Sequence, residues 1–256
     1  MNLFSASALK QKRILVVGGS SGIGRQIAIL SSQCNATLTI VGRNSDKLNS
    51  LRSELDGNDH NFIQSDFMHE SLFESILKNT CGDKLPFDSI IASSGSEYIK
   101  PFLITKKKDF EDCSKTSLDV CMDIARHVSR KNIMKEGGSI VFISSVSTKF
   151  GCPGMGIYAA SRAGIEAVSR VLAAELISKK IRVNTISAGA VMTPMHDRIT
   201  KNLSKESVVK YESSHPLGFG TPMDIASMAV FLVCDMSRWI TGSTFYVDGG
   251  YSSLKL

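Results

Sequence analysis

The sequence is poor in the features that mark several classes of protein. Only six of its 256 residues are cysteines, and no pair of them forms a Cys-x-x-Cys motif or a cysteine–histidine cluster with zinc spacing. They are Cys34, Cys81, Cys113, Cys121, Cys152 and Cys234. We therefore expect reduced, mostly buried thiols, with no disulfide framework and no metal site. No apolar run approaches the roughly 18 residues that cross a bilayer, so no membrane-spanning segment is predicted.

Neither aromatic residues nor one sign of charge dominate. Aromatics make up 7% of the chain, and 30 basic against 24 acidic residues give a scattered net charge of +6. A nucleic-acid interface needs clustered basic side chains with interleaved aromatics, so nucleic acid is not an expected partner. The mild positive balance suits an anionic substrate or cofactor. Because Met1–Arg13 lacks a basic region followed by a long apolar stretch, we expect a cytoplasmic protein.

Short apolar runs alternate with longer segments of helical spacing. The runs are Ile14–Val17, Leu38–Val41, Ile90–Ala92, Ile140–Ile143, Val183–Ile186 and Phe245–Val247. Strands that are apolar on both faces and alternate with amphipathic helices predict a parallel sheet covered by helices on both sides, a doubly wound α/β fold. The length fits a single domain over residues 1–256. The least regular stretch, Met192–Thr221, is predicted to be an insertion that covers a site.

The first predicted strand leads into a glycine-rich turn. It reads Val16-Val17-Gly18-Gly19-Ser20-Ser21-Gly22-Ile23-Gly24. Glycines let the chain turn sharply into a helix and let backbone N–H groups approach a pyrophosphate at the positive end of that helix. A turn that binds nothing is the alternative. On its own the motif predicts only a nucleotide site.

Further motifs follow in order along the chain. They are Ile143-Ser144-Ser145, Tyr158-Ala159-Ala160-Ser161-Arg162, Arg182-Val183-Asn184, Ala188-Gly189 with Thr193, Pro216-Leu217-Gly218, and Thr241-Gly242 with Asp248-Gly249-Gly250. With the Gly-x-x-x-Gly-x-Gly spacing, this series resembles the classical short-chain dehydrogenase/reductases, and among them the 3-oxoacyl-carrier-protein-reductase-like members. The resemblance runs from Lys12 to about Ser252 and implies a Rossmann-type fold that transfers hydride from a nicotinamide.

The resemblance implies that Tyr158 exchanges a proton with the substrate oxygen and that Ser145 hydrogen-bonds the same oxygen. On a helix, Tyr158 and Arg162 share one face, and a fixed cation beside the ring favours the phenolate. The family's usual lysine is Arg162 here, which keeps the charge but does not release a proton. The family's helix asparagine aligns with Ser117, counted from Phe110, and serine is shorter.

The cofactor residues that the resemblance implies lie after successive strands. They are Gly18, Gly19, Ser20, Ser21, Gly22, Ile23, Gly24, Arg43, Asp66, Phe67, Ser93, Gly95, Tyr158, Arg162, Val191 and Thr193. Gly42 stands where NAD-dependent relatives carry an acid, and Arg43 offers a 2′-phosphate a charged fork, so NADP(H) is predicted. A solvated surface charge at Arg43 and a helix N-cap at Asp66 are the alternatives.

The reaction predicted from these motifs is NADPH-dependent reduction of a ketone or aldehyde to an alcohol. Two alternatives stay open: an NAD(P)-dependent alcohol dehydrogenase, and a nucleotide-binding protein with little catalysis, which the changes to Arg162 and Ser117 favour. The resemblance also implies a homotetramer or homodimer through helices expected at 106–131 and 156–178 and through the C-terminal strand. The alanine face of the second helix suits either such an interface or burial against the sheet.

Overall fold

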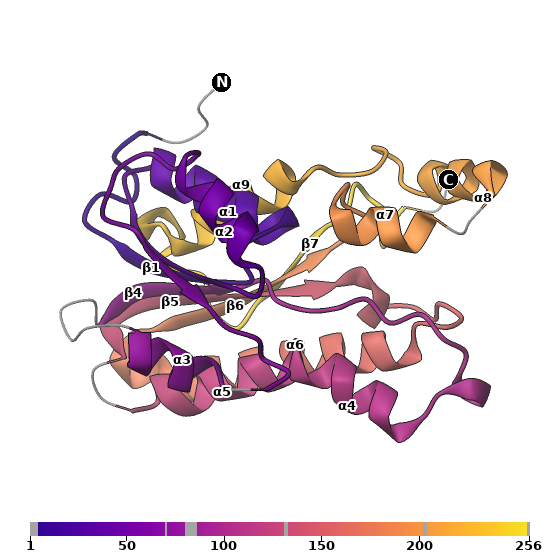
Figure 1. Cartoon of the computed structure of the whole chain (residues 1–256), viewed down its shortest axis with the longest axis horizontal. Helices are drawn as coiled ribbons and strands as arrows, with labels where there is room; N and C mark the ends of the chain where they lie inside the picture. The colour runs from indigo at the N-terminus through magenta and orange to yellow at the C-terminus, as the bar shows by residue number, and fades with distance from the viewer. Residues whose placement is uncertain (1–4, 70, 80–85, 131–132, 202–203, 255–256) are drawn as a thin grey trace.

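The computed structural model describes residues 5–69, 71–79, 86–130, 133–201 and 204–254. A seven-stranded parallel sheet with the order β3-β2-β1-β4-β5-β6-β7 forms its centre (Figure 1). The strands are β1 (Arg13–Val17), β2 (Thr37–Gly42), β3 (Asn61–Gln64), β4 (Phe87–Ala92), β5 (Met134–Ser145), β6 (Arg182–Ala188) and β7 (Thr244–Val247). The predicted doubly wound, Rossmann-type fold is confirmed.

Helices cover both faces of this sheet (Figure 1). On one face lie α1 (Gly22–Gln33), α2 (Ser45–Arg52) and α9 (Pro222–Val233). On the other lie α3 (Leu72–Asn79), α4 (Lys107–Lys115), α5 (Leu118–Val128) and α6 (Gly156–Leu176). Two further helices, α7 (Pro194–Thr200) and α8 (Lys205–Ser213), stand at one end of the molecule. The helices thus form one layer on each side of the strands.

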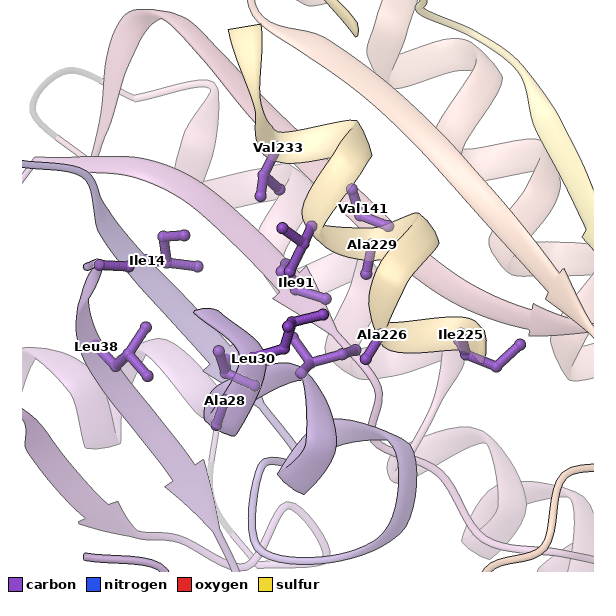
Figure 2. Close-up of a cluster of buried hydrophobic side chains, with 14 of the residues drawn as sticks. Ile14, Ala28, Leu30, Leu38, Ile91, Val141, Ile225, Ala226, Ala229 and Val233 are labelled. Atoms are coloured by element: carbon purple, nitrogen blue, oxygen red, sulfur yellow. The ribbon is translucent and has the colours of Figure 1, made fainter. Parts of the chain in front are cut away.

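Alternation along the strands builds two separate cores. In β1, Ile14 and Val16 pack on the side of α1 and α9, whereas Leu15 and Val17 pack on the other side. Figure 2 shows the first core, in which side chains of α1 and α9 meet those of the strands, including Ile91. Burying each large aliphatic side chain contributes about 1.5–3 kcal/mol, so the sheet is held from both faces.

Three predictions about elements need correction. The short β3 is absent from the predicted strands because only Ile63 of its four residues is buried. The single helix expected at 106–131 is two helices, α4 and α5, separated at Thr116 and Ser117; residues 131 and 132 lie outside the described residues. The irregular stretch Met192–Thr221 contains α7 and α8. Helix formation there follows from side-chain caps, Thr193 for α7 among them.

The structure describes five of the six cysteines. Cys34, Cys113, Cys121 and Cys234 are buried free thiols, and Cys152 is exposed. Cys81 lies outside the described residues. Within the described part of the chain, none of the helices is both long enough and apolar enough to span a membrane.

The strand order fixes where a ligand can bind. β1 pairs with both β2 and β4. The chain therefore continues from β1 to β2 on one side and later returns to β4 on the other side. Loops at the carboxyl ends of these two strands diverge and leave a crevice between them, which is the usual ligand position in doubly wound sheets. The predicted glycine turn follows β1, and Ser93 and Gly95 follow β4. The fold therefore brings both segments to one edge.

Candidate active site

The glycine turn after β1 is packed so closely that side chains are excluded. Gly18 has a φ of +79°, and a Cβ there would lie 2.7 Å from the backbone nitrogen of Ser94. A Cβ at Gly24 would lie 2.2 Å from the carbonyl oxygen of Gly18. Both contacts are with backbone, which cannot move aside as a side chain can. The glycines at these two positions are therefore required by the turn itself.

The start of α1 leaves its backbone donors available. Ser21 is the N-cap, but its side chain makes no capping hydrogen bond, and the first turn holds no acidic residue. The first N–H groups of a helix carry partial positive charge and need acceptors. Thr193, at the start of α7, places its methyl carbon 3.3 Å from the position of a Cβ on Gly22. The turn and the helix start thus supply backbone N–H donors of the kind that bind a pyrophosphate, with the methyl group of Thr193 beside them.

The end of β2 carries the predicted determinant of cofactor choice. A Cβ at Gly42 would lie 2.7 Å from Cβ of Ser20, so this position is occupied by the glycine turn and leaves little room for an acid. Arg43 is exposed, and its side chain forms no salt bridge with any residue in the described ranges. Asp66 caps a turn rather than a helix, since its Oδ1 accepts a hydrogen bond from the Met68 N–H at 3.1 Å.

Tyr158 and Arg162 lie one turn apart on α6. The Arg162 guanidinium carbon is 4.9 Å from the centroid of the Tyr158 ring, a cation–π arrangement. Arg162 is 4% exposed, and its Nη1 donates to the carbonyl oxygen of Ile143 at 3.0 Å. Its Nε is buried without a partner, and no carboxylate within the described residues forms a salt bridge with it. This is a buried cation with unused hydrogen-bonding capacity beside the tyrosine.

Arg162 also reaches the loop after β4. A Cβ at Gly95 would lie 2.1 Å from Nη2 of Arg162, so the glycine makes space for the guanidinium. This contact joins two residues that the sequence predicted separately. Ser93 is bonded to the same edge, since its N–H donates to the carbonyl oxygen of Val17 at 2.9 Å. The loop after β4, the glycine turn and the tyrosine helix therefore converge at the carboxyl edge of the sheet.

The two predicted serines have different surroundings. Ser145 ends β5, is half-buried, and accepts a hydrogen bond from the Ser147 N–H at 3.3 Å. Ser117 is buried between α4 and α5; its hydroxyl lies 2.7 Å from the Cys113 carbonyl oxygen and 2.6 Å from the Ser161 hydroxyl. Since Ser117 donates to the carbonyl, Ser161 donates to Ser117. Ser117 thus ties two helices together, and only its second lone pair is left for another donor.

Two further predicted cofactor residues are placed by packing. Val191 is 7% exposed and bridges to Gly220, at the base of the segment that carries α7 and α8. The ring of Phe67 packs against the core on the α5 side of the sheet. Its backbone, rather than its ring, is the part that can face a ligand, as the resemblance implies.

The helices α7 and α8, here called the α7–α8 segment, contain no buried residue within the described ranges. Ring contacts hold the segment instead. Phe219 lies 4.6 Å from His196 and 5.2 Å from Tyr211, and His215 stacks on Tyr251 at 4.1 Å. Burial, with the charges of Tyr251, Cys152 and Tyr158, raises the pKa of Tyr211 to about 12. Tyr211 therefore stays neutral on the side of the segment that approaches Tyr158.

An ion pair joins the α7–α8 segment to the loop after β4. Arg198 on α7 binds Glu97 through two contacts, one of them Nη2 to Oε2 at 2.9 Å. Burial opposes ionisation of Glu97, but hydrogen bonds and the charges of Arg198 and Arg43 lower its pKa below the ordinary value. The two partners are 101 residues apart. Nothing in the local sequence signals this pair.

A second missed residue is Glu166, which had a readable signal. It follows Arg162 by four residues and Tyr158 by eight, so all three lie on one face of α6. Its Oε1 accepts hydrogen bonds from the hydroxyls of Ser144 and Thr148, both at 2.9 Å. In the described part of the chain no group of three metal-binding side chains comes together.

Comparisons with known proteins agree with this geometry. A family profile described as Enoyl-(Acyl carrier protein) reductase matches residues 17–252. The 3-oxoacyl-[acyl-carrier-protein] reductase of Bos taurus is 35% identical over 240 residues, covering 92% of this chain and 95% of that protein. The FabG 3-oxoacyl-[acyl-carrier-protein] reductase of Chlamydia trachomatis is 32% identical over 246 residues, covering 94% and 98%.

A solved structure supports the same assignment. A short-chain type dehydrogenase/reductase from Mycobacterium ulcerans superposes with a TM-score of 0.82 at 26% identity, covering 96% of this chain and 91% of that one. Sequence and structure therefore agree over nearly the whole length. The chain belongs to the classical short-chain dehydrogenase/reductase family and is an oxidoreductase of the FabG-like kind.

Proposed function

We propose that this protein is an NADPH-dependent reductase that converts a ketone or aldehyde to an alcohol. The observation that carries the proposal is the buried Arg162 cation, 4.9 Å from the Tyr158 ring, beside a glycine turn that fits a dinucleotide. The relatives named as 3-oxoacyl-[acyl-carrier-protein] reductases support a carbonyl substrate. A 3-oxoacyl thioester is the first substrate to test.

In this proposal Tyr158 donates the proton from its hydroxyl to the substrate oxygen. Ser145 donates a hydrogen bond to the same oxygen and orients it. Arg162 stabilises the phenolate that remains, since its charge is fixed over the ring and is partly unsolvated. The nicotinamide, when bound, supplies the hydride. Arg162 cannot release a proton, so Tyr158 regains its proton from water rather than through the cation. Ser117 contributes by holding α5 against α6.

The proposed cofactor contacts follow the loops at the carboxyl edge of the sheet. Backbone N–H groups of the turn from Gly18 to Gly24 hold the pyrophosphate, with the hydroxyls of Ser20 and Ser21 as further donors. Arg43 pairs with a 2′-phosphate, and Asp66 with the Phe67 backbone contacts adenine. Along the nicotinamide half lie Ser93, Gly95, Tyr158, Arg162, Val191 and Thr193.

One observation favours a second candidate, a dinucleotide-binding protein with little turnover. Arginine stands where a proton-releasing lysine is usual, and Ser117 is engaged by Cys113 and Ser161. Arg162→Lys separates the two candidates. A large gain in kcat with unchanged NADPH affinity would favour the second candidate, whereas a kcat within a few-fold of wild type would favour the first.

The test of the proposed function is NADPH and NADH oxidation with a panel of 3-oxoacyl thioesters, simple ketones, aldehydes, keto-sugars and 2-enoyl thioesters. We expect oxidation of NADPH with at least one carbonyl substrate and weaker use of NADH. Reaction only with 2-enoyl thioesters would replace carbonyl reduction by alkene reduction. If no substrate led to NADPH oxidation although NADPH bound tightly, the proposed reaction would be overturned. A preference for NADH would overturn the proposed role of Arg43.

We further propose a cytoplasmic homodimer or homotetramer built through α5 and α6. Met122 on α5 and Val171 on α6 are 53% and 58% exposed, and the alanines at 163, 167 and 174 are exposed rather than buried against the sheet. Met122 also lines a groove of about 630 Å³ along α5. Sedimentation equilibrium would show a dimer or tetramer; a monomer at micromolar concentration would contradict this assembly.

A further inference from the structure

Ser145 sits in a short turn whose two flanks are tied to the tyrosine helix. Ser144, just before it, and Thr148, three residues after it, both place hydroxyls 2.9 Å from Oε1 of Glu166. One carboxylate oxygen therefore accepts hydrogen bonds from both sides of Ser145. Because Glu166 belongs to α6, these bonds connect the serine turn directly to the helix that carries Tyr158.

The neighbouring contact extends the same arrangement by one helical turn. Arg162 donates from Nη1 to the carbonyl oxygen of Ile143, two residues before Ser145. Residues 158, 162 and 166 lie on one face of α6, since they are four apart. Arg162 and Glu166 thus fasten consecutive parts of the strand end to consecutive turns of the helix.

Glu166 is not required for the hydroxyls to find partners. The Ser144 hydroxyl lies 3.2 Å from the carbonyl oxygen of Arg162, and the Thr148 hydroxyl lies 3.0 Å from that of Ser145. If the carboxylate were removed, each donor would keep a backbone acceptor, so no buried donor would be orphaned. Glu166 is half-buried and forms no salt bridge with a described basic residue. Its contribution is therefore to geometry more than to folding.

We propose that Glu166 is a positioning residue that fixes the Ser145 turn against the Tyr158 helix. The inference rests on the proposed function, in which both hydroxyls must meet one substrate oxygen. Glu166 itself touches neither that oxygen nor the cofactor in this role. It acts by accepting two hydroxyl hydrogen bonds, and an amide oxygen at the same position can accept them as well.

The test compares Glu166→Ala with Glu166→Gln. A displacement of reacting groups by about 1 Å can cost about 100-fold in rate, so we expect Glu166→Ala to lower kcat by roughly 10- to 100-fold. NADPH affinity should stay within about 2-fold, and Glu166→Gln should restore kcat to within roughly 3-fold of wild type, because it keeps an acceptor. Glu175→Ala, an exposed glutamate on the same helix, is the matched control and should leave kcat unchanged.

Thr148→Val removes one of the two hydroxyls with little change of volume. It provides a second test of the attachment if Glu166→Ala fails to fold. We expect it to lower kcat by about 3- to 10-fold, and to add little when combined with Glu166→Ala, because both break the same attachment. Wild-type kcat in Glu166→Ala, an equal loss in Glu166→Gln, or full additivity with Thr148→Val would overturn the proposal.

Hydrogen exchange gives a readout that does not depend on catalysis. Amides of residues 145–148 should exchange faster in Glu166→Ala than in wild type, and at the wild-type rate in Glu166→Gln. If the wild-type protein reduces no carbonyl, the proposed function fails while the exchange result still reports on the attachment. If exchange in this turn is the same in all three proteins, the attachment itself is disproved, whatever the activity.

Discussion

The glycine turn and the α7–α8 segment both face the carboxyl edge of the sheet, yet they are built in opposite ways. The turn contacts backbone so closely that Cβ atoms at Gly18 and Gly24 would lie 2.7 Å and 2.2 Å from their nearest neighbours. In the α7–α8 segment no described residue is buried within the helices, and the segment is held by ring contacts and the Glu97–Arg198 pair.

In the proposed function, this difference separates the part of the site that binds the pyrophosphate from the part that faces the substrate. A pyrophosphate has one shape, and the backbone that binds it must approach without side chains in the way. A substrate pocket is instead shaped by side chains, and enzymes often place such side chains on segments that move when substrate binds. We therefore expect the turn to be the rigid half of the site and the α7–α8 segment to be the adjustable half. Substitutions in the two regions should differ accordingly.

The largest effect is expected in the turn. Gly24→Ala puts a methyl group 2.2 Å from the Gly18 carbonyl oxygen, and backbone must shift to relieve the overlap. We expect a loss of about 3 kcal/mol in the free energy of unfolding, as for severe overpacking, together with loss of NADPH binding. Urea denaturation and fluorescence titration with NADPH measure the two effects.

The control lies outside the turn. Gly151 is exposed, has no atom within 4 Å of the position of a Cβ, and does not have a positive φ. Gly151→Ala should change the free energy of unfolding by less than about 0.5 kcal/mol. Comparable losses in Gly24→Ala and Gly151→Ala would show that the turn is not the rigid half.

A smaller effect is expected from the aromatic contacts of the α7–α8 segment. Phe219→Ala removes the ring that touches His196, Tyr211 and His215. Because these contacts are local and the segment has no buried core, we expect about 1 kcal/mol of global destabilisation. Cleavage within the segment should accelerate in limited proteolysis, while NADPH affinity changes little.

Leu217→Ala provides the comparison, since this neighbouring side chain is 85% exposed. It should leave both stability and cleavage rate as in wild type. If Phe219→Ala instead abolished NADPH binding, the two regions would be energetically one unit, and the contrast drawn between them would fail.

The smallest effect concerns pH. Burial lowers the pKa of His196 below its ordinary value of 6.5, and this effect outweighs the nearby carboxylates of Asp197 and Glu212, which act in the opposite direction. A depressed native pKa means that folding favours the neutral ring, so its contribution is present above pH 6.5 and is lost as the pH falls. His196→Phe keeps a ring without this titration. Its Tm should fall less than that of wild type between pH 7.5 and 5, by at most about 2 °C.

The control for this measurement is the Tm of both proteins above pH 7. Above pH 7, both proteins should show parallel pH dependence, because His196 is already neutral in the folded and unfolded states. If the Tm values of the two proteins also changed in parallel below pH 6.5, His196 would not contribute to the stability of the segment.

Residues that act through the backbone were predictable from the sequence. Gly18 and Gly24 could be placed because a turn between strand and helix tolerates few alternatives, and the apolar runs predicted six of the strands. β3 escaped because only Ile63 in it is buried, so it has no apolar periodicity. The break between α4 and α5 at Ser117 was not predicted because no proline or glycine marks it. The Ser117 hydroxyl instead donates a hydrogen bond to the Cys113 carbonyl oxygen at this point.

Pairings between distant segments were not predictable. Glu97 and Arg198 meet only because the loop after β4 and α7 stand at the same edge of the sheet. Glu166 is an intermediate case: its spacing from Tyr158 gave the helix face, but the strand end that this face contacts became known only from the fold. Predicting side-chain attachments between elements thus requires the three-dimensional arrangement, whereas predicting the glycine turn does not.

In the proposed reaction, Tyr158, supported by Arg162, donates the proton to the carbonyl oxygen. The most direct test of this role is the kcat of Tyr158→Phe with NADPH and the best carbonyl substrate, measured beside NADPH affinity. We expect kcat to fall by at least about 100-fold, the usual contribution of a general acid, while NADPH binds within about 3-fold of wild type. A kcat close to that of wild type would contradict this role.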